Sequence, residues 1–217
     1  MQEKKSLSES KSGSEKYRKA YNGIVIALGW LVRILWPFEV IGNTKLPEGG
    51  CVVCPNHISF VDILVLSAGL KGNYLRYMAK KELFSFKPFG AIISAFGAFP
   101  VDRKRGDVGA VKTTISIIKE GNAAVMFPQG HRNPGVDPKT TEVHGGAVLV
   151  ARRAEAPIVP VYIKTKKRRM SLFRPVKIIV GDPVYPAELE EYGADHKSAM
   201  KALFLRACQM EETEKWS

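Results

Sequence analysis

The sequence predicts an α/β protein in which a mixed β-sheet is flanked by helices and preceded by an N-terminal membrane-associated helical segment. Three observations lead to this class. Short apolar runs typical of buried strands alternate with helical segments from about residue 39 onward. The length of 217 residues suits one domain of ordinary size plus a flanking element. The first 38 residues differ from the rest, with a polar stretch followed by an apolar one.

Two segments precede the predicted domain. Residues 1–20 are rich in Lys, Ser and Glu and lack the apolar core of a secretory signal peptide, so we expect a polar, solvated tail. Residues 21–38 carry apolar runs on both sides of Arg33, too short for the roughly 20 apolar residues of a membrane span. Trp30 and Trp36 are typical of a membrane–water interface. We expect a membrane-interacting helix in one leaflet, with a core helix of a soluble domain as the alternative.

The elements of the domain, residues 39–217, follow from local patterns. Apolar runs bounded by turn-forming residues predict strands, and apolar residues at helical spacing predict helices. Strands are expected at 50–54, 74–79, 123–127, 158–163 and 176–180, and helices at 63–68, 108–119, 145–155 and 196–211. The apolar stretch 86–101 is broken by two prolines and two glycines, so no element is assigned to it.

The charge and the cysteine content limit which classes of partner and which cellular compartment we expect. A formal net charge of +12 indicates a negatively charged partner: anionic lipid headgroups, nucleic acid, or an acidic protein or phosphorylated substrate. Three cysteines argue against a disulfide framework and for a reducing compartment. Cys51 and Cys54 have the C-x-x-C spacing of redox pairs, but they lie within an apolar run, so we expect small buried side chains.

His57 and Asp62 follow the first predicted strand, where it gives way to a helix. Loops at the strand ends of α/β folds present reactive side chains on a rigid support. A carboxylate bonded to one imidazole nitrogen fixes the tautomer and leaves the other nitrogen as a general base. The two residues are therefore a candidate catalytic pair. Their spacing alone is found more often at an ordinary helix start.

Three further blocks carry possible chemistry. The run 127–133 (FPQGHRN) follows a predicted strand and places a glycine near Arg132, which suits an anionic ligand; a turn with a solvated arginine is the alternative. The run 96–105 (FGAFPVDRKR) ends in three cations, as in a phosphate site beside a lipid-facing surface or in a loop that keeps the chain soluble. The run 157–162 (PIVPVY) has the apolar character of a buried strand.

These four blocks, in this order, resemble the glycerophospholipid acyltransferase family, in particular 1-acyl-glycerol-3-phosphate (lysophosphatidic acid) acyltransferases. The family's N-H-x4-D motif is matched by Asn56, His57 and Asp62, and its G-x-x-[FP]-[IV]-x-R motif by residues 97–103. Residues 127–132 match F-P-E-G-T-R, and residues 159–161 match V-P-V. The resemblance covers about residues 40–185. Gln129 replaces the family's glutamate, and His131 its threonine.

The resemblance implies that residues 39–217 are an acyltransferase domain. It would move an acyl chain from acyl-CoA or acyl-carrier protein to the 2-hydroxyl of lysophosphatidic acid, giving phosphatidic acid. His57, oriented by Asp62, would be the general base. The expected substrate-binding residues are Arg103 and Arg132 at the phosphate, together with Lys80, Gln129, Gly130 and His131. No cofactor is expected, and no metal, since the four histidines are scattered without ligand spacing.

The predicted partners are an anionic membrane surface, lysophosphatidic acid and the acyl donor, at the cytoplasmic face of the membrane in a peripheral or monotopic manner. No nucleic acid is expected, because no helix-turn-helix, RNA-recognition or zinc-finger signature occurs. The basic run 164–169 either gathers anionic ligands or is a solvated face. Two alternatives remain: the same chemistry on another lyso-lipid or glycerol-3-phosphate, and a non-catalytic basic module that binds membrane or nucleic acid.

Overall fold

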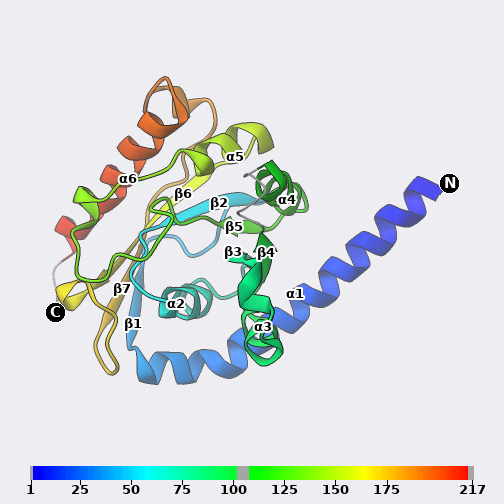
Figure 1. Ribbon diagram of the computed structural model, residues 1–217, viewed down its shortest axis with the longest axis horizontal. Helices are drawn as coiled ribbons and strands as arrows, with labels where there is room; N and C mark the ends of the chain where they lie inside the picture. Colours follow the sequence, from blue (N-terminus) through cyan, green and yellow to red (C-terminus); the bar gives the residue numbers. More distant parts are fainter. Residues whose placement is uncertain (1, 102–107, 215–217) are drawn as a thin grey trace.

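The computed structural model describes residues 2–101 and 108–214, with side chains from residue 18 onward. Within this part of the chain, a seven-stranded sheet has the order β1-β7-β6-β2-β5-β3-β4 (Figure 1). The strands are β1 (Phe38–Ile41), β2 (Cys51–Pro55), β3 (Leu75–Lys80), β4 (Ala98–Val101), β5 (Ala123–Val125), β6 (Ile158–Thr165) and β7 (Val176–Val180). The α-helices are α1 (Gln2–Leu35), α2 (Val61–Gly69), α3 (Lys87–Ala95), α4 (Val108–Lys119), α5 (Gly146–Ala154) and α6 (His196–Thr213). Short 3-10 helices are η1 (Lys81–Phe84), η3 (Pro138–Thr140), η4 (Lys166–Arg168) and η5 (Glu188–Glu190).

The sheet is mixed, as predicted. The pairings of β1 with β7 and of β2 through β6 with one another are parallel, whereas β6 and β7 pair antiparallel. Parallel neighbours need crossover connections, which α2, α3, α4 and α5 supply between successive strands. The antiparallel return from β6 to β7 needs only the loop of residues 166–175. The α/β class with helices on both faces is thereby confirmed.

Two cores sandwich the sheet. Helices α1 and α2 cover one face, and α4, α5 and α6 cover the other (Figure 1). Side chains of β2 alternate between them: Cys51 and Val53 face α1 and α2, whereas Val52 and Cys54 face the opposite helices. Burial raises the pKa of the Cys51 thiol to about 12. Cys51 and Cys54 are therefore buried packing residues on opposite faces, as the apolar run indicated, and not a redox pair.

Regular structure also occurs where the sequence led to no assignment. β1 starts the domain, and the broken apolar stretch 86–101 contains both α3 and β4. Pro88 lies in the first turn of α3, where its missing N–H costs nothing. Gly97 has a φ of +81°, and a Cβ there would lie 2.1 Å from the Leu75 carbonyl oxygen. These two residues mark element boundaries rather than the absence of elements.

Helix α1 has apolar side chains on two sides. Tyr21, Val25 and Val32 are buried against the domain, whereas Ile26 and Trp30 are more than half exposed. No helix in the described residues is both long and apolar enough to cross a bilayer. The division into a tail at 1–20 and a membrane-interacting segment at 21–38 stays a prediction.

Candidate active site

The carboxyl ends of the parallel strands β2, β3, β5 and β6 meet at one edge of the sheet. His57 lies two residues after the end of β2, and Lys80 is the last residue of β3. The segment 127–132 follows β5. Ligand sites of α/β sheets lie outside the carboxyl ends of strands, so the topology brings the sequence motifs to the expected place.

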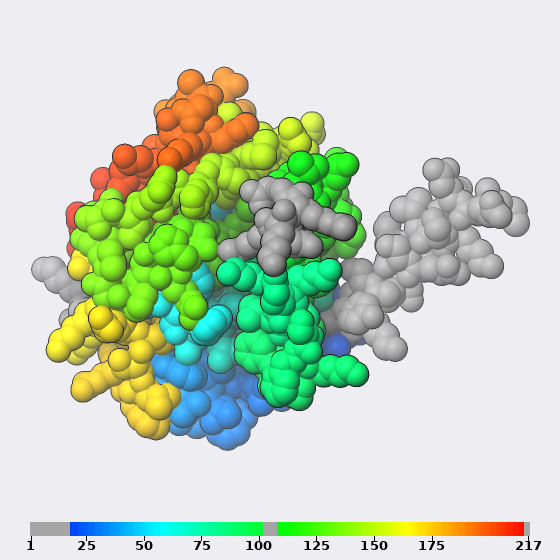
Figure 2. Space-filling view, in the orientation of Figure 1, coloured from blue at the N-terminus to red at the C-terminus, as the bar shows by residue number. Residues whose placement is uncertain are grey.

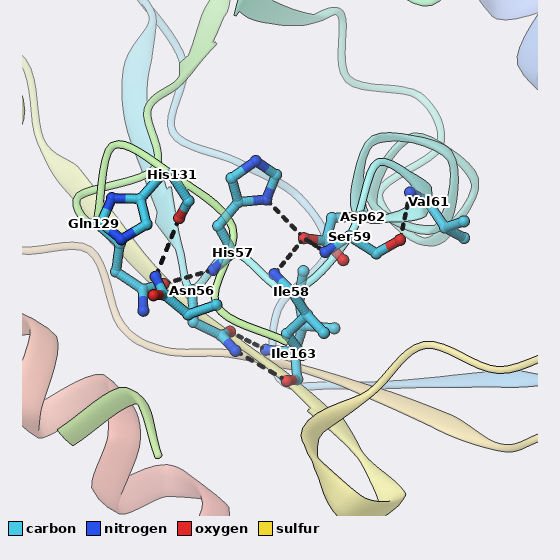
Figure 3. Close-up of polar contacts among 10 residues, drawn as sticks. Asn56, His57, Ile58, Ser59, Val61, Asp62, Gln129, His131 and Ile163 are labelled. Atoms are coloured by element: carbon cyan, nitrogen blue, oxygen red, sulfur yellow. Dashed lines mark hydrogen bonds and ion pairs between the residues drawn. The ribbon is translucent and has the colours of Figure 1, made fainter. Parts of the chain in front are cut away.

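His57 and Asp62 are in direct contact (Figure 3). The imidazole Nδ1 lies 2.7 Å from Asp62 Oδ2, which also accepts the backbone N–H groups of Ile58 (2.7 Å) and Ser59 (2.9 Å). Asp62 is fully buried in the first turn of α2, where the helix dipole favours a negative charge. A carboxylate only accepts hydrogen bonds, so Nδ1 donates and Nε2 of the neutral ring is left as a proton acceptor.

The segment after β5 holds His57 from three directions. The Phe127 ring stacks on the imidazole, with centroids 3.8 Å apart and planes 20° apart. The backbone N–H of His57 donates to Gln129 Oε1 at 2.7 Å, and the His57 carbonyl accepts from the Asn133 N–H at 2.9 Å. The imidazole is therefore fixed on a braced backbone as well as by Asp62, which is what a positioned base requires.

The side chain of Asn56 continues the hydrogen bonding of β2 with β6 beyond the end of β2. Its Nδ2 donates to the Ile163 carbonyl at 3.1 Å, and its Oδ1 accepts the Ile163 N–H at 2.6 Å (Figure 3). The amide thus replaces the next backbone pair of the β2–β6 ladder, and the main chain turns away at His57. This explains why an asparagine precedes the histidine: the side chain satisfies two buried backbone groups.

Gln129 is buried and its contacts are internal. Its Oε1 accepts from His57, and its Nε2 donates to Thr141 Oγ1 at 2.8 Å. The Thr141 hydroxyl donates in turn to the Pro138 carbonyl at 2.7 Å. These bonds position the His57 backbone without using a charge. Direct contact of Gln129 with a substrate stays a prediction.

Gly130, His131 and Arg132 are exposed beside the imidazole. Gly130 has a φ of +70°, which favours glycine, and its N–H donates to the Phe127 carbonyl at 3.0 Å. Among the described residues, no hydrogen bond uses the backbone N–H of His131 or Arg132. Both N–H groups are consequently available as hydrogen-bond donors.

Two pockets meet at His57. The larger, of about 990 Å³, is lined partly by Phe60, Phe89 and Ile93, and the smaller, of about 450 Å³, by apolar residues of β5, α4 and α5 with His144. Both share His57, Met78, Gly130 and His131 in their walls. In Figure 2 the cyan residues around 57–60 lie in a hollow between the green α3 segment and the light-green segment around 130. A substrate bound in either pocket would therefore reach the imidazole of His57.

Cations line the larger pocket only. Lys80 and Arg132 were expected there, and Arg169 joins them from the loop between β6 and β7. The Arg132 guanidinium lies 3.6 Å from the centroid of the Phe60 ring. Within the described ranges, no carboxylate forms an ion pair with any of the three cations. Arg103, the other predicted phosphate ligand, lies outside the described residues.

Arg169 and Phe60 were missed as site residues. Arg169 belongs to the basic run 164–169, which the sequence allowed either to gather anionic ligands or to be a solvated face. Phe60 lies inside the N-H-x4-D motif. In the described part of the chain, no group of three His, Cys, Asp or Glu side chains is arranged to hold a metal. The absence of a cofactor stays an expectation.

Comparison with known proteins agrees with this geometry. The sequence profile named Acyltransferase matches residues 37–164. The 1-acyl-sn-glycerol-3-phosphate acyltransferase of Bacillus subtilis is 34% identical over 153 residues, covering 69% of this chain and 75% of that protein. The enzyme of the same name from Streptococcus pneumoniae is 34% identical over 143 residues, covering 61% of this chain but only 51% of its own length.

A solved structure has the same fold. The 1-acyl-sn-glycerophosphate acyltransferase PlsC of Thermotoga maritima matches with a TM-score of 0.67 at 22% identity, covering 92% of this chain and 80% of that one. The family match extends over more than half of the sequence, and its limits include the matches to N-H-x4-D, F-P-E-G-T-R and V-P-V. The chain belongs to the acyltransferase family, and it is an O-acyltransferase.

Proposed function

We propose that this enzyme transfers an acyl chain from a thioester donor to the 2-hydroxyl of lysophosphatidic acid, giving phosphatidic acid. The observation that carries the proposal is the Asp62-bonded imidazole of His57 at the junction of two pockets, only one of which is lined by cations. The names of the Bacillus and Streptococcus relatives support lysophosphatidic acid as the acceptor.

In this proposal His57 is the general base. Nε2 removes the proton of the acceptor hydroxyl, and Asp62 stabilises the imidazolium that forms. The alkoxide attacks the thioester carbonyl to give a tetrahedral oxyanion. Its collapse forms the ester and expels the thiolate, which takes the proton from the imidazolium. No acyl-enzyme intermediate is required.

The free backbone N–H groups of His131 and Arg132 are our candidates for stabilising the oxyanion. They lie in the turn that lines both pockets beside His57. Donors fixed in a turn need no reorganisation when charge develops, which is the basis of oxyanion stabilisation.

The larger pocket suits the acceptor. Its cations, Lys80, Arg132 and Arg169, would bind the phosphate, with Arg103 as a further candidate, and its apolar wall at Phe89 and Ile93 would receive the acyl chain. The donor thioester would then approach through the smaller pocket. Acyl-CoA and acyl-carrier protein are both compatible with this arrangement.

We further propose that the enzyme works on the cytoplasmic face of the membrane, peripheral or monotopic. The outer side of α1 exposes Ile26, Trp30 and Ile34 at helical spacing, and Ile92 of α3 and Phe86 just before that helix are also exposed. Exposed apolar stripes on a protein with a net charge of +12 suit an anionic leaflet.

The test is acyl transfer with purified protein, one acyl donor and a panel of lyso-acceptors. Lysophosphatidic acid is expected to give the highest kcat/KM, and His57→Ala to abolish turnover while the circular dichroism spectrum stays unchanged. His196→Ala, at the start of α6 and outside the lining of both pockets, is the matched control. A substantial remaining turnover in His57→Ala would overturn the mechanism.

The same panel decides the alternative acceptors. Gln129 and His131 are the two departures from the family pattern, and His131 lines both pockets. Preference for another lyso-lipid or for glycerol-3-phosphate would keep the mechanism and change the substrate. A non-catalytic basic module gives no role to a buried carboxylate that holds an imidazole between two pockets.

A further inference from the structure

The loop of residues 166–175, between β6 and β7, has two sides with different characters. On one side, Arg169, Met170 and Ser171 line the larger pocket. The next two residues, Leu172 and Phe173, are 55% and 65% exposed. The wall of the acceptor pocket therefore continues directly into an exposed apolar tip.

The tip is hydrogen-bonded to α1, the helix that carries the exposed apolar stripe. The Phe173 N–H donates to the Leu35 carbonyl at 2.6 Å, at the end of α1. Figure 2 shows this loop, in yellow, beside the blue end of α1. Leu172 and Phe173 are thus held next to the end of α1.

The base of the loop is hydrogen-bonded to the segment that follows the active-site turn. The Arg168 carbonyl accepts the Gly135 N–H at 2.7 Å, and the Arg168 guanidinium pairs with Asp137 at 3.1 Å. The loop therefore connects the end of α1 to the residues that directly follow the segment bracing His57.

The backbone of the loop is held in an unfavourable conformation. Lys167, Arg168 and Phe173 have φ values of 58°, 51° and 58°, in the left-handed region that residues with a Cβ avoid. Such conformations persist where the surrounding contacts determine them, and they cluster at functional segments. An aromatic residue is kept in this state with its ring in solvent.

The charge of the loop selects the partner. Residues 166–175 contain five cations and no carboxylate. Cations flanking an exposed Leu-Phe pair match a layer of anionic headgroups above an acyl region. An acidic protein would match the charges but would not require the apolar pair.

We propose that this loop is a membrane-contacting lip of the acceptor pocket. Leu172 and Phe173 enter the acyl region of an anionic leaflet, Lys167 and Arg174 contact headgroup phosphates, and Arg169 meets the acceptor phosphate at the pocket entrance. This inference rests on the proposed function, since it assigns the pocket to a lyso-lipid.

The test is the variant Leu172→Ser/Phe173→Ser. Binding to phosphatidylglycerol vesicles, and turnover of lysophosphatidic acid embedded in them, are each expected to fall at least about ten-fold, as loss of two inserted apolar side chains predicts. Turnover of a monodisperse short-chain lysophosphatidic acid is expected to stay unchanged. Unchanged vesicle binding, or an equal loss on both acceptors, would overturn the proposal.

Tyr185→Ser is the matched control. Tyr185 is 51% exposed but follows Val184, which pairs with Ile158 at the opposite end of β6. Its replacement is expected to leave vesicle binding unchanged. His57→Ala is expected to bind vesicles like the wild type, so failure of the catalytic mechanism and failure of the lip are distinguishable.

A fluorescent label provides the second measurement. All three native cysteines are buried, so Phe173→Cys can be labelled selectively with a polarity-sensitive dye. We expect a blue shift with phosphatidylglycerol vesicles, and none for labelled Tyr185→Cys. A shift with acyl-carrier protein but not with vesicles would assign the loop to the donor protein and overturn the proposal.

Discussion

Asp62→Asn separates the charge of the carboxylate from its hydrogen bonds. The amide oxygen of asparagine can accept the same N–H groups of His57, Ile58 and Ser59, so the loop geometry is retained. The lost quantity is the attraction between a carboxylate and the imidazolium that forms during proton transfer.

The size of the effect follows from the 2.7 Å contact between His57 Nδ1 and Asp62 Oδ2. Such a contact places the two charge centres about 4 Å apart, where unit charges attract by about 4 kcal/mol at an effective dielectric constant near 20. At about 1.4 kcal/mol per factor of ten, kcat/KM is expected to fall about 10³-fold.

The assay is thiol release from the acyl donor together with phosphatidic acid formation, with urea unfolding as a check of stability. Asp182→Asn, on an exposed carboxylate, is the control and should lose nothing. The double variant Asp62→Asn/His57→Ala should be no slower than His57→Ala alone, because Asp62 acts through His57. Retention of more than about a tenth of kcat/KM in Asp62→Asn would refute the electrostatic argument.

Three further predictions concern the hydrogen bonds that support the site and the buried thiols of the core. Asn56→Ala should lower the free energy of unfolding by about 2–5 kcal/mol in urea titrations, because it strands two buried backbone groups of β6; a change below about 1 kcal/mol would contradict this. Gln129→Leu should destabilise by about 2–4 kcal/mol and Gln129→Glu by less, since a carboxylate still accepts the His57 N–H; the reverse order would show that this bond is unimportant. Burial raises the pKa of Cys51 and Cys208 to about 12, so native thiols should not react with an aromatic disulfide reagent at pH 8. Since unfolded thiols ionise near pH 8.5, this burial should favour folding fully below that pH and progressively less toward pH 12; rapid native reaction at pH 8 would refute the assignment.

Much of the architecture was predictable because its signals are local. The helix at 108–119 and the strand at 176–180 have the predicted bounds, since apolar periodicity and glycine punctuation identify both. Missing were β1 and β4, each of four residues. β5 is shorter still, with three residues, but it lies in a continuous apolar run, whereas the prolines and glycines around β4 obscure any such run.

The site likewise contains residues that local motifs predict and residues that only the folded sheet brings into place. His57, Asp62 and Arg132 lie in motifs at strand ends, and the shared carboxyl edge of the sheet brings those motifs together. Arg169 comes from the loop after β6, whose carboxyl end lies at the active-site edge because β6 pairs parallel with β2. That pairing is a property of the whole sheet. The internal role of Gln129 likewise depends on Thr141, which no motif includes.

The amide of Asn56 has a consequence for the order in which this enzyme is made. Its two bonds reach Ile163, 107 positions further along the chain, and β2 itself lies between β5 and β6. Contacts of such long range form late, after the loop-closure entropy has been overcome. A ribosome that has released only the first 150 residues therefore exposes the His57 motif without the strand that positions it. The first 150 residues include β2 to β5, which neighbour one another in the sheet, so catalytic competence is expected only once β6 has emerged and paired with β2.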